Sequence, residues 1–126
     1  MDDEIIKIYE KEGMKEIIDK IRDIGFDELV KSGHFLYSVD EKNTDIEMLR
    51  KNFKEMGKIR LIQQRKHRNE KLSYDFYYEL EDKTYIVYSI AFEEKIVLIN
   101  GFHVSRNFEH FKKALMRAYK NKLVGN

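Results

Sequence analysis

The chain of 126 residues contains no cysteine and no proline. The absence of cysteine excludes disulfides, thiolate nucleophiles and cysteine-based zinc or iron–sulfur sites. No apolar run approaches the roughly 18 to 20 residues that a membrane span requires. The chain begins Met1-Asp2-Asp3-Glu4, which is acidic where a secretion signal is basic. We therefore expect a cytoplasmic protein that does not associate with a membrane.

The remaining composition favours a packed interior. Hydrophobic residues make up 42% of the chain and charged residues 37%, so the charge is high but enough apolar side chains are present to form a core. A chain of this length fits one domain of ordinary size. We therefore treat residues 1–126 as a single domain.

The formal net charge of +1 conceals a segregation of charge along the chain. Residues 1–57 carry 15 acidic and 10 basic side chains, whereas residues 58–126 carry 8 acidic and 14 basic ones. A basic half can supply phosphate contacts to a nucleic acid, and an acidic half can face away from that ligand or cover the basic surface until a partner displaces it. Alternatively, both charged surfaces serve only to keep the protein soluble.

The first 57 residues carry apolar side chains mostly at helical spacing. Asp2 or Asp3 can cap a first helix that carries Ile5, Ile6 and Tyr9. A second apolar stripe, at spacings of three and four, comprises Met14, Ile17, Ile18, Ile21 and Ile24. This part of the chain is therefore predicted to be helical, with a possible kink at Gly13 and an end at Gly25.

Two further segments complete this acidic part. The Thr44-x-x-Glu47 pattern predicts the start of another helix, which ends at Gly57. The segment 34–39 is compatible with a short strand or with an irregular structure, and the sequence does not decide between them.

From Lys58 the apolar period changes from three or four to two. In residues 72–80 apolar and polar side chains alternate, as a strand with one buried and one wet face requires. Three other runs have strand character, at 59–64, 84–92 and 95–102. The links 81–83 and 93–94 are short enough for hairpins, so the last three strands should be antiparallel. A final amphipathic helix opens at Asn107. These features together predict an α+β fold in which N-terminal helices (1–57) precede a basic part (58–126) with a four-stranded, mainly antiparallel sheet and a C-terminal helix.

The link between the first two of these strands concentrates positive charge. It contains Arg65, Lys66, Arg68 and Lys71 together with His67. With Arg60, these side chains are the best candidates for a phosphate-binding surface, because each Lys or Arg that neutralises a phosphate releases counterions. A hairpin tip is also the usual place for solvated Lys and Arg.

Aromatic side chains alternate with this basic segment. Tyr77 lies on the predicted wet face of its strand, where it could stack against a base. Tyr74 and Tyr78 belong to the apolar face and are predicted to be core residues.

A second candidate cluster follows the last strand. His103 could exchange a proton near neutral pH, and Arg106 could stabilise the negative charge of a phosphorane. A histidine at the end of a strand can also be merely exposed or a capping residue. Because His103 and His110 have no third ligand nearby in the sequence, we expect no metal, and no cofactor motif is present.

The C-terminal half resembles the RelE/HigB-type toxin family of the RelE/ParE-like superfamily. The resemblance is carried by the run Tyr85-Ile-Val-Tyr-Ser-Ile90, a charged turn, the run Lys95-Ile-Val-Leu-Ile-Asn-Gly-Phe102 and a basic helix with Ala114-Leu115 and Arg117-Ala118. It covers less than half of the chain. Asn100 stands where the family usually has a histidine before the glycine.

This resemblance implies a small α+β toxin that cleaves mRNA without a metal, usually at the ribosome, and that pairs with an antitoxin protein. It implies that Arg60, Arg65 and Arg68 supply charges around the phosphorane. His103 would then act as acid or base, and Arg106 would supply a further phosphate contact. For these roles the four arginines must converge on one concave surface.

Two other classes of function remain open at this level. The acidic helical part is compatible with a non-enzymatic protein of phage or host origin that binds and blocks a partner protein. The basic part alone is compatible with a nucleic-acid-binding module without catalysis.

Overall fold

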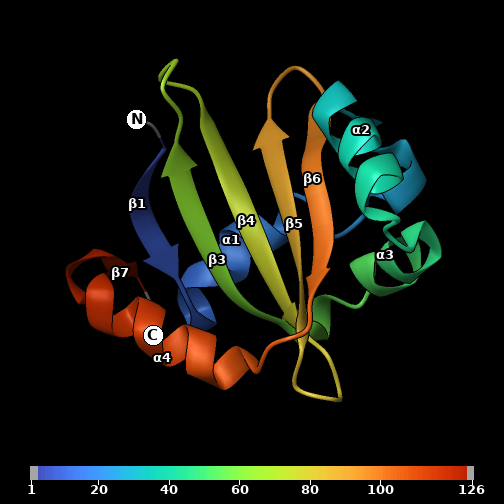
Figure 1. Ribbon diagram of the computed structural model, residues 1–126. Helices are drawn as coiled ribbons and strands as arrows, with labels where there is room; N and C mark the ends of the chain where they lie inside the picture. Colours follow the sequence, from blue (N-terminus) through green and yellow to red (C-terminus); the bar gives the residue numbers. More distant parts are fainter. Residues whose placement is uncertain (1–2, 125–126) are drawn as a thin grey trace.

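The computed structural model describes residues 3–124, which form a seven-stranded mixed sheet and four α-helices (Figure 1). The strands are β1 (Glu4–Tyr9), β2 (Val30–Lys31), β3 (Ile59–Lys66), β4 (Leu72–Glu79), β5 (Tyr85–Phe92), β6 (Ile96–Val104) and β7 (Leu123–Val124). The helices are α1 (Lys15–Asp19), α2 (Gly33–Lys42), α3 (Ile46–Phe53) and α4 (Phe108–Ala118). In space the strands follow the order β2-β6-β5-β4-β3-β1-β7.

The predicted α+β class agrees with this architecture, but the predicted four-stranded sheet behind N-terminal helices is wrong. The described chain begins with strand β1, which pairs antiparallel with β3 and parallel with β7. The pairing with β3 shifts register between Ile5 and Lys7. This irregularity interrupts the alternation of side chains that identifies a strand, so Ile5, Ile6 and Tyr9 resemble a helical pattern in the sequence.

The central part of the sheet confirms the predicted strands. Strands β3, β4, β5 and β6 are consecutive antiparallel neighbours, as the short links between them require. Because β1 joins the edge of β3, the sheet contains residues from both sides of Gly57, and the change in charge at that point does not coincide with a structural boundary.

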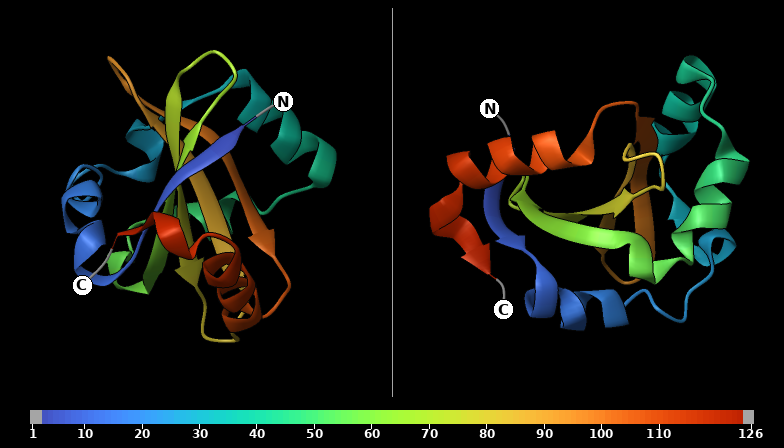
Figure 2. Two further views of the ribbon diagram at one scale, coloured as in Figure 1. Left: turned by 90° about the vertical axis from the view of Figure 1, so that its left-hand side faces the viewer. Right: turned by 90° about the horizontal axis from the view of Figure 1, so that it is seen from below.

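Helices cover both faces of a strongly curved sheet (Figure 2). One face packs against α1, α2 and α3, and its buried apolar cluster includes Phe35, Leu49, Phe76, Tyr78 and Tyr88. The other face packs against α4, and its smaller cluster includes Ile8, Leu61, Tyr77, Phe108 and Leu115. The prediction that one face of β4 is exposed to water is therefore wrong, because that face is also covered.

Helix α2 occupies the segment 34–39, which is neither a strand nor irregular. Ser32 caps its first turn by accepting a hydrogen bond of 3.0 Å from the Phe35 backbone N–H. The Ser32 hydroxyl and backbone N–H also donate to carbonyl oxygens of β6, at Ile99 and Leu98. These contacts fix the start of α2 beside the middle of β6.

Candidate functional site at the open end of the sheet

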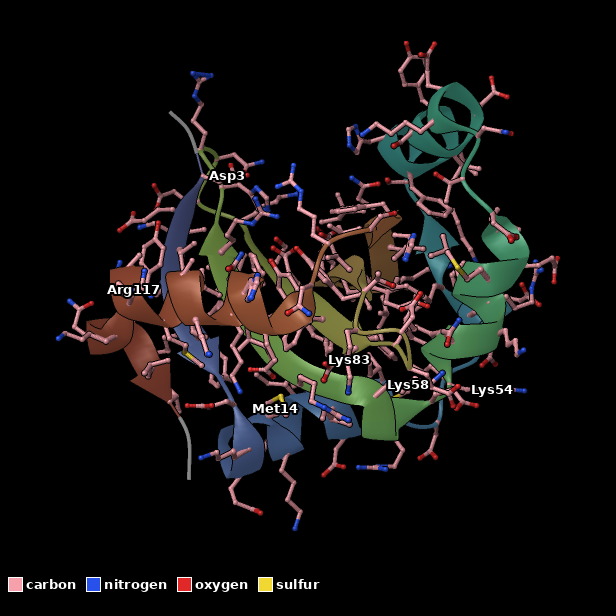
Figure 3. The ribbon with its side chains drawn as sticks, turned by 60° about the horizontal axis from the view of Figure 1, so that its bottom comes forward. Asp3, Met14, Lys54, Lys58, Lys83 and Arg117 are labelled. Carbon is pink, nitrogen blue, oxygen red and sulfur yellow. The ribbon has the colours of Figure 1, made fainter. Side chains whose placement is uncertain are left out.

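The face that carries α4 changes from apolar to polar along the strands. One row across β3 to β6 consists of the paired residues Leu61, Tyr77, Val87 and Phe102, and α4 packs beside it. The row two residues further along consists of Gln63, Asp75, Ser89 and Asn100. Figure 3 shows Asp3 beyond one long side of α4. The polar end of the face is therefore a candidate place for a ligand.

Asp75 is the centre of the polar row and is almost completely buried, with 1% of its surface exposed. Its carboxylate accepts hydrogen bonds from Ser89 Oγ at 2.6 Å and from Gln63 Nε2 at 3.0 Å. Arg65 Nη2 lies 2.8 Å from the same carboxylate. A buried carboxylate needs this number of partners, because removing it from water without them would cost several kcal/mol.

Arg65 links Asp75 to the open surface. Its Nη1 lies 3.4 Å from Asp3 Oδ2, and its Nε is buried without a hydrogen-bond partner among residues 3–124. Burial of the guanidinium opposes its charge, but the carboxylates of Asp75 and Asp3 outweigh that effect and raise the pKa of Arg65. Arg65 is therefore a permanent positive charge held in a fixed orientation.

Both ring nitrogens of His67 have a polar neighbour. Its Nδ1 lies 3.1 Å from Asp3 Oδ1, and its Nε2 lies 2.6 Å from Ser73 Oγ. The carboxylate of Asp3 can only accept, which favours a neutral ring with its hydrogen on Nδ1, and Nε2 then accepts the Ser73 hydroxyl proton. The pairing of Glu4 with Lys66 brings Asp3 alongside His67. In this tautomer Nε2 is the nitrogen that can accept a proton.

A cavity of about 370 Å³ opens beside this histidine. Its lining comprises Asp3, His34, Arg65, His67, Ser73, Ser89, Ile99, Asn100 and Phe102. His34 reaches it from the first turn of α2, which Ser32 anchors to β6. Two histidines that are 33 positions apart in the sequence therefore line one cavity together with a partly buried arginine.

Two further hollows adjoin this cavity and share Asp3 with it. One has a volume of about 360 Å³ and is lined by His67, Arg68 and Asn69 as well as Asp3. The other has about 350 Å³ and extends past Arg65 to Tyr119 and Lys122. Because the three hollows share Asp3, we treat them together and call them the Asp3 groove.

The Asp3–His67–Ser73 arrangement has the order of a serine hydrolase triad, but its surroundings do not suit acyl transfer. Ser73 is only 1% exposed and lies within β4 opposite Arg65. Acyl transfer needs an accessible nucleophile and N–H groups directed at the oxyanion, whereas a regular strand uses its N–H groups in the sheet. Proton transfer by His67 to or from a substrate hydroxyl fits the geometry better.

The sequence-predicted site residues fall into two separate groups. Arg65, His67 and Arg68 line the Asp3 groove, and Lys66 and Lys71 lie in the same hairpin. Lys66 Nζ lies 3.5 Å from Glu70 Oε1, and the Lys66 side chain is half-exposed at the rim. These five residues therefore lie together at this end of the sheet.

The other predicted residues lie at the opposite end, where Figure 1 shows the β4–β5 link and the start of α4. Arg60 pairs with Glu79 at 3.3 Å. His103 Nε2 lies 2.9 Å from Thr84 Oγ1, and Arg106 belongs to a different cavity. The four arginines do not converge on one surface.

Tyr77 is not available for stacking against a base. It is 7% exposed and packs against Phe111 of α4, with ring centroids 5.0 Å apart. The predicted exposed aromatic side chain is thus a core residue, because α4 covers the face that the alternating pattern assigned to water.

Sequence reasoning missed the residues that complete the groove. The sequence offers Asp2 or Asp3 as a helix cap, gives His34 no role, and places Ser73 and Asp75 on the wet face of a strand. The available signal was one polar residue inside each of three predicted strands, at Gln63, Asp75 and Ser89, which the structure places opposite one another.

Comparison of the chain with protein families, with curated proteins and with solved structures finds no match. Within residues 3–124, no group of three or more histidine and carboxylate side chains is placed to hold a metal ion. No helix in the same range is long and apolar enough to cross a membrane.

Proposed function

We propose that this protein is a metal-independent endoribonuclease whose active site is the Asp3 groove. The observation that carries the proposal is the position of His67, which is held by Asp3 and Ser73 beside Arg65 in a cavity that His34 also lines. Two imidazoles and a guanidinium supply a base, an acid and a positive charge, which are the groups that cleavage by an RNA 2'-hydroxyl needs.

In the proposed reaction the His67 ring turns away from the buried Ser73 hydroxyl, so that Nε2 faces a ribose 2'-hydroxyl in the cavity. His67 removes its proton, the 2'-oxygen forms a bond with the adjacent phosphorus, and the bond from phosphorus to the 5'-oxygen breaks. His34 gives a proton to that leaving oxygen. Arg65 faces the phosphorane, whose added negative charge its guanidinium stabilises. The products are a 2',3'-cyclic phosphate and a free 5'-hydroxyl.

The groove and its rim support a single-stranded RNA as the substrate. Arg68 lies at one end of the groove and Lys122 at the other, so a strand that crosses it passes His67 with a positive charge on either side. Ribosome-bound mRNA as the natural substrate and a cognate antitoxin that covers the groove are further parts of the proposal, and they depend on the RelE/HigB resemblance.

The experiment uses a short single-stranded RNA in EDTA, with products identified by their termini. We expect cyclic phosphate ends and a loss of rate of at least about a hundredfold in His67→Ala. His103→Ala is the matched control and should cleave at the wild-type rate, because His103 lies at the other end of the sheet. Equal rates for wild type and His67→Ala, or intact RNA with and without ribosomes, would contradict the proposal.

A second candidate function is binding and blocking of a protein partner. It is favoured by exposed apolar side chains on α2, where Leu36 and Tyr37 are 53% and 66% exposed. Large apolar side chains that are exposed at consecutive positions of a helix are typical of contact surfaces. This alternative predicts that Leu36→Ser with Tyr37→Ser abolishes the biological effect of the protein, whereas His67→Ala leaves it unchanged.

A further inference from the structure

A second cavity lies at the end of the sheet opposite the Asp3 groove. It has a volume of about 530 Å³ and is lined by Tyr85, Arg106, Asn107, His110, Phe111 and Ala114. This volume lies within the range of small-molecule sites in proteins. None of its lining residues takes part in the Asp3 groove, so the cavity requires an explanation of its own.

The cavity has an aromatic floor. Tyr85 and Phe111 pack with ring centroids 5.3 Å apart and an angle of 27° between their planes. Tyr85 is 5% exposed, whereas Phe111 is partly exposed and Ala114 is exposed. The small side chain of Ala114, one helical turn after Phe111 and His110, leaves the space above the rings open. A flat apolar group would bury these surfaces.

The polar groups of the cavity are cationic or donating. Arg106 precedes the helix and His110 lies in its first turn, next to the N-terminus of α4, where the helix dipole favours negative charge. The side chain of Asn107 is already used, because it caps the helix by accepting from the His110 N–H at 3.1 Å. The carbonyl of Lys83 accepts from the Phe108 N–H at 2.8 Å and fixes the β4–β5 link against the helix.

The Tyr85 hydroxyl adds a polar group to the cavity. Tyr85 is 5% exposed and lines the cavity, and its hydroxyl oxygen retains access to solvent. Burial raises the pKa of Tyr85, and the nearby Arg106 guanidinium opposes that rise. A ligand in the cavity can therefore take the place of solvent at this hydroxyl.

We propose that this cavity binds a small aromatic anion, with its ring on Tyr85 and Phe111 and its acidic group between Arg106, His110 and the Tyr85 hydroxyl. The proposal is independent of the function assigned to the Asp3 groove. A purely apolar ligand would leave the Tyr85 hydroxyl and Arg106 unpaired, and an inorganic anion would leave the aromatic floor uncovered.

The test measures binding of naphthalene-2-carboxylate and of its neutral analogue naphthalene-2-carboxamide by NMR titration of the full chain. We expect the carboxylate to bind at least about tenfold more tightly, because an ion pair with hydrogen bonds is lost in the amide. Arg106→Gln and Tyr85→Phe should both weaken carboxylate binding. Arg117→Gln, an exposed position near the other end of α4 (Figure 3), is the matched control and should bind as wild type does.

A third variant keeps the test informative if the Tyr85 substitution disturbs the core. Ala114→Leu changes an exposed helix position and should fill the space above the rings, which would abolish binding of both probes. Equal affinity for the carboxylate and the amide, unchanged binding in Arg106→Gln, or chemical-shift changes confined to the Asp3 groove would overturn the proposal.

Discussion

Gly101 of β6 lies directly beneath the ring of Phe35 from α2. A methyl group on its Cα would stand 3.3 Å from Phe35 Cε1 and 3.4 Å from Leu49 Cδ1 of α3. The absence of a side chain at this one position of the sheet allows α2 and α3 to approach it closely. Helix α2 also carries His34, which lines the Asp3 groove.

Gly101→Ala is therefore expected to destabilise the protein by about 1 to 3 kcal/mol, because both neighbours are buried and cannot move away without repacking. Urea denaturation followed by circular dichroism measures the change. Gly57→Ala is a suitable control, since nothing lies within 4 Å of a Cβ at that position. A loss in Gly101→Ala no larger than that in Gly57→Ala would show that the packing beneath Phe35 is looser than described.

Asp75→Ala should lower the free energy of unfolding by about 3 kcal/mol. The substitution leaves the charge of Arg65 and the donors of Gln63 and Ser89 without their common acceptor. The exposed Asp40→Ala in α2 should change stability by less than about 0.5 kcal/mol. Similar small effects of both substitutions in a denaturation experiment would contradict the network around Asp75.

The acid side of the stability profile is expected to depend on Asp82. The Thr84 hydroxyl and then the Thr84 backbone N–H donate to its carboxylate and hold the pKa of Asp82 below its ordinary value of 3.8. A lowered acid pKa contributes stability that is complete above the ordinary value and is lost as the pH falls through the folded value. Thermal unfolding of Asp82→Asn should therefore show a deficit at neutral pH that shrinks below about pH 4. The exposed neighbour Glu81→Gln should parallel the wild-type profile, and a pH-independent deficit in Asp82→Asn would refute the assignment.

Ser73→Ala distinguishes the two chemistries that the Asp3 groove could support. If a substrate hydroxyl replaces the serine hydroxyl at His67 Nε2, the variant should keep RNA cleavage within about tenfold of wild type. Acyl transfer by Ser73 would instead be abolished. Rates with single-stranded RNA and with a p-nitrophenyl ester, measured on the same preparations, decide between them. Loss of cleavage in Ser73→Ala, with the fold intact by circular dichroism, would argue against the proposed role of His67.

The regular parts of the fold could be predicted from the sequence. The alternation in β4 and the short links around β5 were sufficient for the central antiparallel strands, and Asn107 marked the start of α4. Strands β2 and β7 have two residues each, which is too short for any periodic signal. Helix α2 buries only Phe35 and Ser38, so its apolar stripe is too narrow to identify a helix.

The site was less predictable because it depends on pairing between distant segments. Arg65, His67 and Arg68 were found as a dense basic run, which is a local feature of the sequence. The position of Asp3 depends on the register of β1 against β3, and that of His34 depends on the anchoring of α2 to β6. Neither contact can be recognised from the residues that neighbour it in the sequence. The alternating rule also treats polar residues as exposed. It fails for Ser73 and Asp75 because each is buried with hydrogen-bond partners inside the protein, His67 for Ser73 and Gln63 and Ser89 for Asp75.

Strand β1 lies between β3 and β7, and this order constrains the assembly of the protein during translation. Its first partner is completed only at Lys66, and its second partner consists of residues 123 and 124. For much of synthesis β1 therefore presents an unpaired edge of the kind that invites pairing with another chain. A shortened chain that ends before Leu123 would keep that edge, so we expect such chains to self-associate more readily than the intact protein.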